Sequence, residues 1–276
     1  MSLITVDTSR CAKDGLCVAV CSFNLLRLND DGYPEEIPTP GPCMACGHCV
    51  AVCPKEALTN HNLPDEALLP VYKDLPSSQA VDGMLLARRS VRYFKDQAIP
   101  QETLASVLDV ARHAPTACNL QQLQWIVAPN AAKVRELAAE AVAWVRDVGV
   151  HMDGFSMMTK EEVEENLPIV LKFWEHGEDF ILRGASALVM VCAPDYDWAR
   201  EDCATALTFL ELAAEARGLG VCWAGIFTRL AMVHAPLREI LGIPEGYTLG
   251  GTLMLGVPKY RYRRVPPRKP LSVRWI

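Results

Sequence analysis

Four cysteines in the first quarter of the chain have a spacing that predicts metal-cluster chemistry. Cys43, Cys46, Cys49 and Cys53 are followed directly by Pro54, which gives the pattern C-x2-C-x2-C-x3-C-P. Thiolates at every third position of a tight loop converge on one face of an iron–sulfur cluster, and the cysteine before the proline can reach a different cluster. Zinc is the alternative, but structural zinc sites usually join two C-x2-C pairs across a long spacer. The spacing therefore favours iron–sulfur and predicts electron transfer.

A second run upstream follows the same pattern with two departures. Cys11, Cys17 and Cys21 occupy the first, third and fourth cysteine positions, whereas Asp14 stands at the second position and Ser22 at that of the proline. Together the two runs resemble those of a bacterial two-cluster ferredoxin, over roughly the first sixty residues. Between them, residues 29–32 (Asn-Asp-Asp-Gly) predict a hairpin turn.

The ferredoxin resemblance implies that each run lends its last cysteine to the cluster of the other run. The implied ligand sets are Cys43, Cys46, Cys49 and Cys21 for one cluster, and Cys11, Cys17 and Cys53 for the other, with Asp14 as the candidate fourth ligand. A carboxylate is a harder and more labile ligand than a thiolate. The Asp14 site could therefore hold a four-iron [4Fe-4S] cluster through Asp14 or a three-iron [3Fe-4S] cluster without it, and a solvated loop aspartate is the other interpretation of this residue.

Length and composition indicate a cytoplasmic protein of two parts. The chain has 276 residues, half of them apolar, with a formal charge of −6, which leaves ample length for one α/β domain beside a ferredoxin-sized module. The amino terminus has neither a basic start nor a cleavage site, and no apolar run reaches the length of a membrane span. We therefore expect a reducing cytosol and no membrane partner. The remaining cysteines are expected to be buried structural thiols: Cys118, Cys192, Cys203 and Cys222.

The end of the chain is basic, since seven Lys or Arg and no acid follow from Lys259 onwards. Such a segment could be a nucleic-acid arm. It is short and interrupted by prolines, however, and a bound phosphate or a subunit contact would use the same residues, so we predict no nucleic-acid partner.

The prolines at 64, 70 and 76 predict a linker between the two parts. We expect a ferredoxin-like iron–sulfur domain at 1–62, a linker at 63–80 and a second domain at 81–276. Within the second domain, apolar patterns predict helices at about 100–113 and 201–217, and buried strands at 187–192 and 252–258. Helices that alternate with buried strands predict an α+β fold class, with a mixed α/β sheet domain.

Four motifs of the second domain occur in a fixed order. They are Arg88-Arg89-Ser90-x-Arg92-x-Phe94, Ala114-Pro115-Thr116-Ala117-x-Asn119-Leu120-Gln121, Gly218-Leu219-Gly220-x-x-Trp223-x-Gly225 and Arg264-x-Pro266-x-Arg268. These motifs resemble the nitroreductase family of flavin enzymes, from about residue 80 to the end. The resemblance implies an intertwined homodimer that holds FMN at the subunit interface, in a mixed sheet surrounded by helices.

The resemblance also implies roles for individual residues. Arg88, Arg89, Ser90 and Arg92 would bind the FMN phosphate, because guanidinium forks suit phosphate oxygens; a solvated basic helix end is the alternative. Arg264, and with it Arg261, would form a second phosphate clamp, although Tyr262 stands where relatives often carry a lysine.

Two further segments would contact the flavin ring. In the family, the loop with Pro115, Thr116, Ala117 and Asn119 reaches the ring edge and ribityl chain from the partner subunit; a turn-forming asparagine is the alternative. Ala224 and Gly225, with Gly220, are small residues that let backbone N–H groups approach flavin N5.

The other candidates lack a specific pattern. His113 ends a helix, where a cation is favoured by the helix dipole, and His48 lies inside the cluster loop, where it could tune the cluster. Residues 147–180 could form a substrate lid or an ordinary helical insertion; the residues of interest there are His151, Met152, Phe155, Met157, Met158, Trp174 and His176. No catalytic side chain is identified.

The predicted function is electron transfer to a small molecule. The chain has no G-x-G-x-x-G between a strand and a helix and no Walker loop. We expect an external low-potential donor to feed the clusters, and FMN to collect two electrons for a small organic acceptor, such as a nitroaromatic. The alternatives are a non-enzymatic electron carrier, which needs no substrate pocket, and a flavin-dependent dehalogenase or cofactor-modifying enzyme of the same fold.

Overall fold

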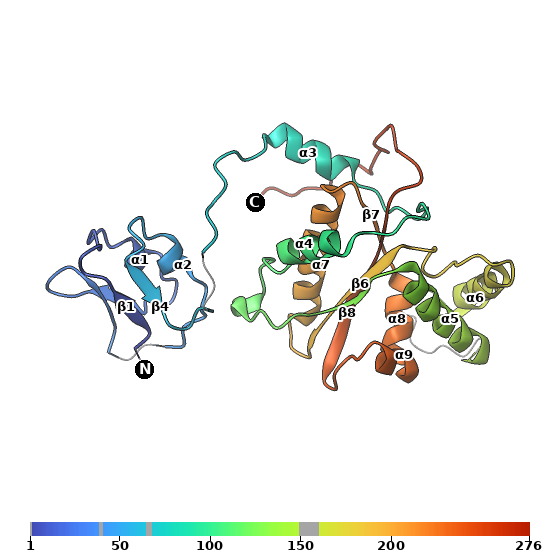
Figure 1. Ribbon diagram of the computed structural model, residues 1–276, viewed down its shortest axis with the longest axis horizontal. Coiled ribbons are helices and arrows are strands. Elements are labelled where there is room, and N and C mark those ends of the chain that lie inside the picture. The colour runs from blue at the N-terminus through green and yellow to red at the C-terminus, as the bar shows by residue number, and fades with distance from the viewer. Residues whose placement is uncertain (1, 39–40, 65–67, 149–159) are drawn as a thin grey trace. The chain divides into compact units, whose positions relative to one another are not determined.

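The computed structural model describes residues 2–38, 41–64, 68–148 and 160–276. The chain divides into two compact units, which are coloured along the sequence in Figure 1. Unit 1 comprises Met1–Leu75 together with Ala117–Leu120, and unit 2 comprises Pro76–Thr116 and Gln121–Ile276. The lid candidates His151, Met152, Phe155, Met157 and Met158 lie outside the described residues.

Unit 1 is built from two small antiparallel sheets and two short helices. Strand β1 (Ile4–Val6) pairs with β4 (Leu58–Asn60), and β2 (Leu26–Leu28) pairs with β3 (Pro34–Glu36). The helices are α1 (Leu16–Ala19) and α2 (His48–Ala51). Between β2 and β3, the backbone N–H of Asn29 donates to the carbonyl of Tyr33, and the Asn29 side chain accepts from Asp31 and Tyr33. The predicted hairpin turn is confirmed.

The two halves of unit 1 repeat one another at a constant interval. Helix α1 and strand β2 in the first half correspond to α2 and β4 in the second. Gly15 and Gly47 precede the two helices, with φ values of 70° and 74°. A left-handed backbone suits glycine, which has no Cβ to clash there. The repeat therefore places equivalent cysteines at equivalent points of the two halves.

The apolar core of unit 1 is small. Its buried members are Ile4, Leu26 and Leu58, together with the thiols of Cys17 and Cys49. So few apolar side chains give little burial free energy for a unit of this size, and small domains of this kind usually rely on metal binding for stability.

Unit 2 is built around a four-stranded sheet in the order β5-β6-β8-β7. The strands are β5 (Gln124–Ala128), β6 (Ala187–Pro194), β7 (Gly220–Trp223) and β8 (Tyr247–Gly256). All paired neighbours are antiparallel, and a parallel bridge joins Ser90 to Val221 at the β7 edge. The predicted α+β class is confirmed.

Helices cover both faces of this sheet (Figure 1). Alternate residues of β6 point to opposite faces: Leu188 and Met190 pack in one apolar cluster, and Val189 and Val191 in the other. The first cluster includes residues of α5 (Ala131–Val148), α6 (Lys160–Glu175), α8 (Gly225–Val233) and α9 (Ala235–Ile240). The second includes residues of α4 (Gln101–Ala111) and α7 (Ala199–Glu215). Helix α3 (Ser78–Ala87) also belongs to unit 2, whereas the 3-10 turn η1 (Ala117–Asn119) belongs to unit 1.

The contact between α7 and β8 is close because β8 carries glycines there. A Cβ placed on Gly250 would lie 2.1 Å from Cβ of Cys203 on α7. A Cβ on Gly251 would lie 2.5 Å from Cδ1 of Leu207. Any larger residue would push the helix away from the sheet.

Within the described residues, no helix is long and apolar enough to cross a bilayer.

Candidate functional site

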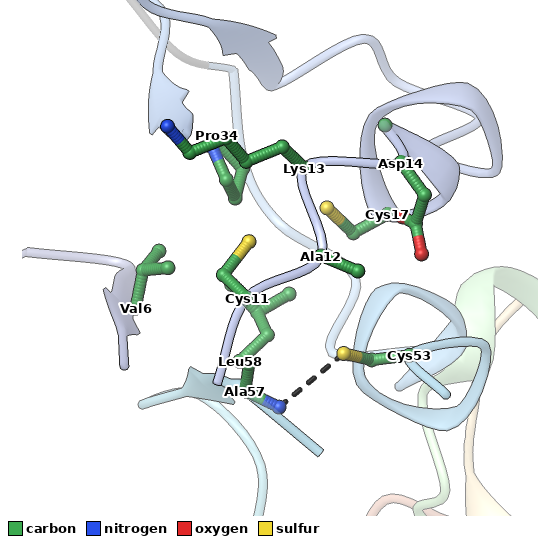
Figure 2. A pocket seen from close by; sticks show the side chains of 11 residues that line it. Val6, Cys11, Ala12, Lys13, Asp14, Cys17, Pro34, Cys53, Ala57 and Leu58 are labelled. Atoms are coloured by element: carbon green, nitrogen blue, oxygen red, sulfur yellow. Dashed lines mark hydrogen bonds between the residues drawn. The ribbon is translucent and has the colours of Figure 1, made fainter. Parts of the chain in front are cut away.

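The cysteines of unit 1 form two groups, and the first surrounds a cavity of about 20 Å³. Cys11, Cys17, Cys53 and Asp14 line this cavity (Figure 2). Burial raises the pKa of Cys17, and the neighbouring thiols of Cys11 and Cys53 raise it further. The structure thus brings the last cysteine of the second run to the first two cysteines of the first run.

The second group combines cysteines of the second run with the last cysteine of the first run. Burial raises the pKa of Cys49, and the thiols of Cys46 and Cys21 act in the same direction, while an amide N–H of Asn60 opposes them. The same Asn60 amide lies 3.7 Å from the Cys43 sulfur. Cys21 of the first run therefore belongs with the three cysteines of the second.

Backbone N–H groups point at three of these sulfur atoms, from Leu25 to Cys21, from Ala57 to Cys53 and from Ala45 to Cys43, at 3.3–3.4 Å. Hydrogen bonds to sulfur stabilise thiolates that carry cluster charge. The donors present therefore fit iron–sulfur ligation. In the described ranges, no group of three or more His, Cys, Asp or Glu is placed to hold a single metal ion, as a zinc site would require.

Asp14 lies at the edge of the first group. Its carboxylate Oδ1 accepts the backbone N–H of Leu16 at 3.1 Å, at the start of α1. In Figure 2 the drawn carboxylate oxygen lies on the other side of Cys17 from the Cys11 sulfur. The Asp14 side chain is exposed, and its contact with the Leu16 N–H holds the backbone at the start of α1 without a metal.

In unit 2, arginines line a cavity of about 330 Å³. Its lining residues are Arg88, Arg89, Ser90, Arg92, Tyr262, Pro266 and Arg268. The guanidinium of Arg89 donates through Nη1 to the carbonyl of Arg88, but its buried Nε and Nη2 have no hydrogen-bond partner among the described residues. A buried cation without acceptors is unfavourable. A phosphate in the cavity would supply those acceptors, so the residues fit the phosphate of FMN.

Arg88 has a contact outside the cavity, and only part of the basic end segment reaches the cavity lining. Arg88 forms an ion pair of 2.8 Å with Glu211, a buried residue of α7. This pair ties the first motif to the helix behind the sheet. In the basic end segment, Arg268 lines the cavity, whereas Arg261 and Arg264 are exposed and lie outside its lining.

The turn around η1 has a left-handed backbone, with φ of 49° at Cys118 and 55° at Asn119. This conformation projects the Cys118 side chain to the surface, so the expectation that Cys118 is buried is wrong. For the other three cysteines the expectation is confirmed, because Cys192, Cys203 and Cys222 are buried. Burial raises the pKa of Cys203 to about 12.

Asn119 belongs to unit 1, although its neighbours Thr116 and Gln121 belong to unit 2. Its side-chain amide donates to the carbonyl oxygens of Met44 and Ala45, at 3.0 Å each. Both carbonyls lie between the cluster cysteines Cys43 and Cys46. Of the other predicted residues of this loop, Thr116 accepts the backbone N–H of Gln121, and Pro115 is exposed next to the half-buried Ala117.

The small residues after β7 have different roles. Ala224 is buried and its N–H donates to the carbonyl of Thr252, while the exposed Gly225 begins α8. The first N–H groups of a helix lack acceptors within the helix, so this end can serve an outside acceptor. Gly220 packs instead, since a Cβ there would lie 2.8 Å from Val91.

The remaining candidates have ordinary surroundings. His48 and His113 are exposed. The His176 ring lies 2.7 Å from the carbonyl of Lys172, and the Trp174 ring receives the guanidinium of Arg135 at 4.8 Å.

Three residues of these sites were not predicted from the sequence. Arg268 ends the Arg264-x-Pro266-x-Arg268 motif, and its position in the basic segment was the available signal. Glu211 lies one helical turn beyond Leu207 on the buried face of α7, and an acid on an apolar face indicates a buried partner. Asn60 gave no signal in the sequence, because its contact depends on how β4 lies against the cluster loops.

Comparisons with known proteins agree with both units. Residues 85–257, more than half of the chain, match the model of the nitroreductase family, and residues 3–54 match that of the 4Fe-4S dicluster domain. A provisionally named NADH dehydrogenase/NAD(P)H nitroreductase of Archaeoglobus fulgidus is 31% identical over 182 residues, which are 64% of this chain and 84% of that protein. A protein named Ferredoxin 7Fe, from Hydrogenibacillus schlegelii, is 31% identical over 67 residues, covering 24% of this chain and 82% of that protein.

The fold also matches a solved structure. A nitroreductase from Desulfitobacterium hafniense, crystallised with bound FMN, superposes with a TM-score of 0.55 at 23% identity, over 70% of this chain and 96% of that one. The chain therefore belongs to the nitroreductase family of oxidoreductases and carries a 4Fe-4S dicluster domain before its family domain.

Proposed function

We propose that this protein takes electrons from an external low-potential donor into two iron–sulfur clusters and uses bound FMN to reduce a small conjugated organic acceptor, such as a nitroaromatic. The observation that carries the proposal is the arginine-lined cavity, in which the buried guanidinium of Arg89 lacks acceptors among the described residues. The family membership and the two cysteine groups supply the context.

The phosphate of FMN would be held by Arg89, Ser90, Arg92 and Arg268. Arg88 acts through its ion pair with Glu211, which fixes the backbone of the same motif. Bound FMN would supply the ability to accept electrons singly and to release them in pairs. Gly225 would offer its backbone N–H to the ring edge, and Ala224, whose own N–H donates to Thr252, would lie beside it as a small residue. Pro115, Thr116 and Ala117 would contact the ring from a neighbouring subunit.

The clusters would be held by Cys21, Cys43, Cys46 and Cys49, and by Cys11, Cys17 and Cys53. We assign the second of these sets a three-iron cluster, since the Asp14 carboxylate is engaged by Leu16 and the relative named Ferredoxin 7Fe matches this part of the chain. A reducing compartment suits both the clusters and the free thiols.

A homodimer completes the proposed assembly. Helix α3 exposes Leu85 and Leu86, and the end segment exposes Leu271 and Trp275, the latter 92% accessible. Large apolar side chains gathered on such segments are typical of surfaces that a partner covers. A second copy of the chain would bury them.

The side-chain amide of Asn119 binds the loop between Cys43 and Cys46. In the sequence, Asn119 follows closely on Pro115 and Thr116, which we propose as flavin contacts.

The test is anaerobic reduction of the protein with its clusters and FMN. Photoreduction, NADH and NADPH are compared as electron sources, because the name of the Archaeoglobus relative includes NAD(P)H. The reduced protein is then mixed with 4-nitrobenzoate and with a quinone, and flavin absorbance is followed. We expect photoreduction to bleach the flavin and the small acceptors to reoxidise it. Flavin that stays reduced with every small acceptor, yet is reoxidised by a protein partner, would establish the carrier alternative.

A further inference from the structure

Asn60 is a buried polar residue of unit 1 that no family motif accounts for. It ends β4 and is only 6% exposed. Its side-chain Nδ2 lies 3.7 Å from the sulfur of Cys43 and 3.8 Å from that of Cys49. Both sulfurs belong to the group that includes Cys21 and Cys46.

The orientation of the Asn60 amide follows from its other contact. Its Oδ1 accepts the backbone N–H of Asn62 at 2.9 Å. A backbone N–H can only donate, so the oxygen must face it and the NH2 must face the two sulfurs. The backbone of this segment is fixed as well, through the pairing of Asn60 with Ile4 and the bond from His61 to Leu3. The N–H groups of the Asn60 amide are therefore fixed in the direction of the two sulfurs.

Among the described residues of the first half of unit 1, the position equivalent to Asn60 has no side-chain donor. In the repeat, Leu28 at the end of β2 corresponds to Asn60 at the end of β4. Leucine has no N–H in its side chain, and Leu28 is 44% exposed. Leu25 and Ala57 donate to Cys21 and Cys53 at equivalent positions, whereas the backbone bond from Ala45 to Cys43 belongs to the second half. Asn60 adds a side-chain donor to the cysteine group that contains Cys43.

We infer that Asn60 raises the reduction potential of the cluster held by Cys21, Cys43, Cys46 and Cys49 above the value that its cysteines and backbone alone would give. A reduced cluster carries one more negative charge than an oxidised one, and N–H groups directed at its ligand sulfurs stabilise that charge. Burial strengthens the effect at the Cys49 sulfur, because both Cys49 and Asn60 are buried and water competes little there. Asn60 would thus stabilise the reduced form of this one cluster through its contact with the ligand sulfurs.

This inference depends on the proposed function, since it requires that the cysteines hold clusters. The same loop also binds Asn119 through the carbonyls of Met44 and Ala45.

The experiment is a redox titration followed by EPR on the anaerobically purified full-length chain. In Asn60→Leu, which copies the residue of the other half, we expect the potential of one cluster to fall. The expected size is at least a tenfold change in its reduced-to-oxidised ratio at fixed potential, which is 59 mV for a one-electron couple. The other cluster, identified by its response to Asp14→Cys, should keep its potential.

The control is Thr59→Val, on the exposed face of the same strand, which should leave both potentials unchanged. Unchanged potentials in Asn60→Leu, or equal shifts of both clusters, would overturn the inference. Absence of iron–sulfur signals from the wild-type protein would instead overturn the proposed function.

A second measurement covers the case in which Asn60→Leu loses iron. Wild-type protein is labelled with ¹⁵N in the side-chain amides of asparagine, and pulsed EPR is recorded on the reduced clusters. A nitrogen coupling to one cluster supports the donation from Asn60. A spectrum without such a coupling contradicts it.

Discussion

Asp14 occupies the position in the first run that Cys46 holds in the second, yet its carboxylate binds the backbone of Leu16. This contact uses only one carboxylate oxygen, and the second oxygen is the candidate metal ligand. In the proposed cluster, a ligand at this one position decides between three and four irons.

Replacing Asp14 by cysteine should therefore convert one cluster only. We expect iron analysis to rise from about seven to about eight irons per chain, because the fourth thiolate completes a four-iron site. The change should appear as the loss of one EPR signal while the other persists. Asp14→Asn, which keeps an oxygen for the Leu16 N–H, is the matched control and should retain the wild-type iron content. Eight irons already in the wild type would show that Asp14 or water is a ligand.

In the proposed function, the guanidinium of Arg89 binds the phosphate of FMN. Replacing Arg89 by leucine should weaken FMN binding roughly 10- to 100-fold, because hydrogen bonds to charged groups contribute about 1.5–3 kcal/mol. Fluorescence titration of FMN into the flavin-free protein measures this.

A paired comparison tests the second phosphate contact. Arg268→Ala should weaken FMN binding, because Arg268 lines the cavity, while the exposed Arg264 should tolerate alanine. If Arg264→Ala is the more damaging change, the phosphate lies outside the cavity described above.

At the scale of elements, the approach of α7 to β8 shapes the core of unit 2. Gly250→Ala should destabilise the fold by about 1–3 kcal/mol, because its Cβ would overlap that of Cys203. Urea unfolding followed by circular dichroism measures the loss. Gly83→Ala is the control, since nothing lies within 4 Å of a Cβ there and alanine favours a helix. Equal stability in Gly250→Ala and the wild type would mean that the two elements separate easily.

The Cys203 thiol, at the contact between α7 and β8, makes the free energy of unfolding depend on pH. Burial raises the pKa of Cys203 from 9.0 to about 12, so the folded state keeps its proton where the unfolded state loses it. The resulting stability is fully present below pH 9 and is lost progressively between pH 9 and about 12. We expect the free energy of unfolding to fall more steeply with pH in the wild type than in Cys203→Ala. Parallel slopes would contradict this.

The whole molecule combines unit 1, which has a small apolar core, with unit 2, which has a large one. The proposed clusters would stabilise unit 1, and unit 2 exposes apolar side chains on α3 and the end segment. Assembly into a dimer would cover them.

Trp275 tests this assembly directly. Trp275→Ala should weaken the dimer roughly tenfold or more, because buried tryptophans are common centres of interface energy. Light scattering over a dilution series measures the dissociation. Arg274→Ala, the adjacent polar change, should have a smaller effect, and a wild type that is monomeric at every concentration would contradict the homodimer.

Much of this molecule could be predicted from local patterns. The C-x2-C-x2-C-x3-C-P run predicts ligands because neighbouring thiolates in a tight loop can only converge. The apolar residues of β6 predict a buried strand, and the predicted hairpin turn at Asn29 is present. The reach of Cys21 and Cys53 to the opposite groups came from the family resemblance.

The rest required contacts between distant segments. Cys118 is exposed because of a left-handed turn, which its apolar neighbours in the sequence did not indicate. The contacts that matter for three residues are made with segments far away in the sequence; these residues are Arg268, Glu211 and Asn60. Residue types and spacing determined which chemistry this protein can support, because ligand geometry in a tight loop is local. Only the tertiary structure decided which described arginine has buried nitrogens without an acceptor and which group of cysteines faces a side-chain amide, because burial and hydrogen bonding depend on the whole fold.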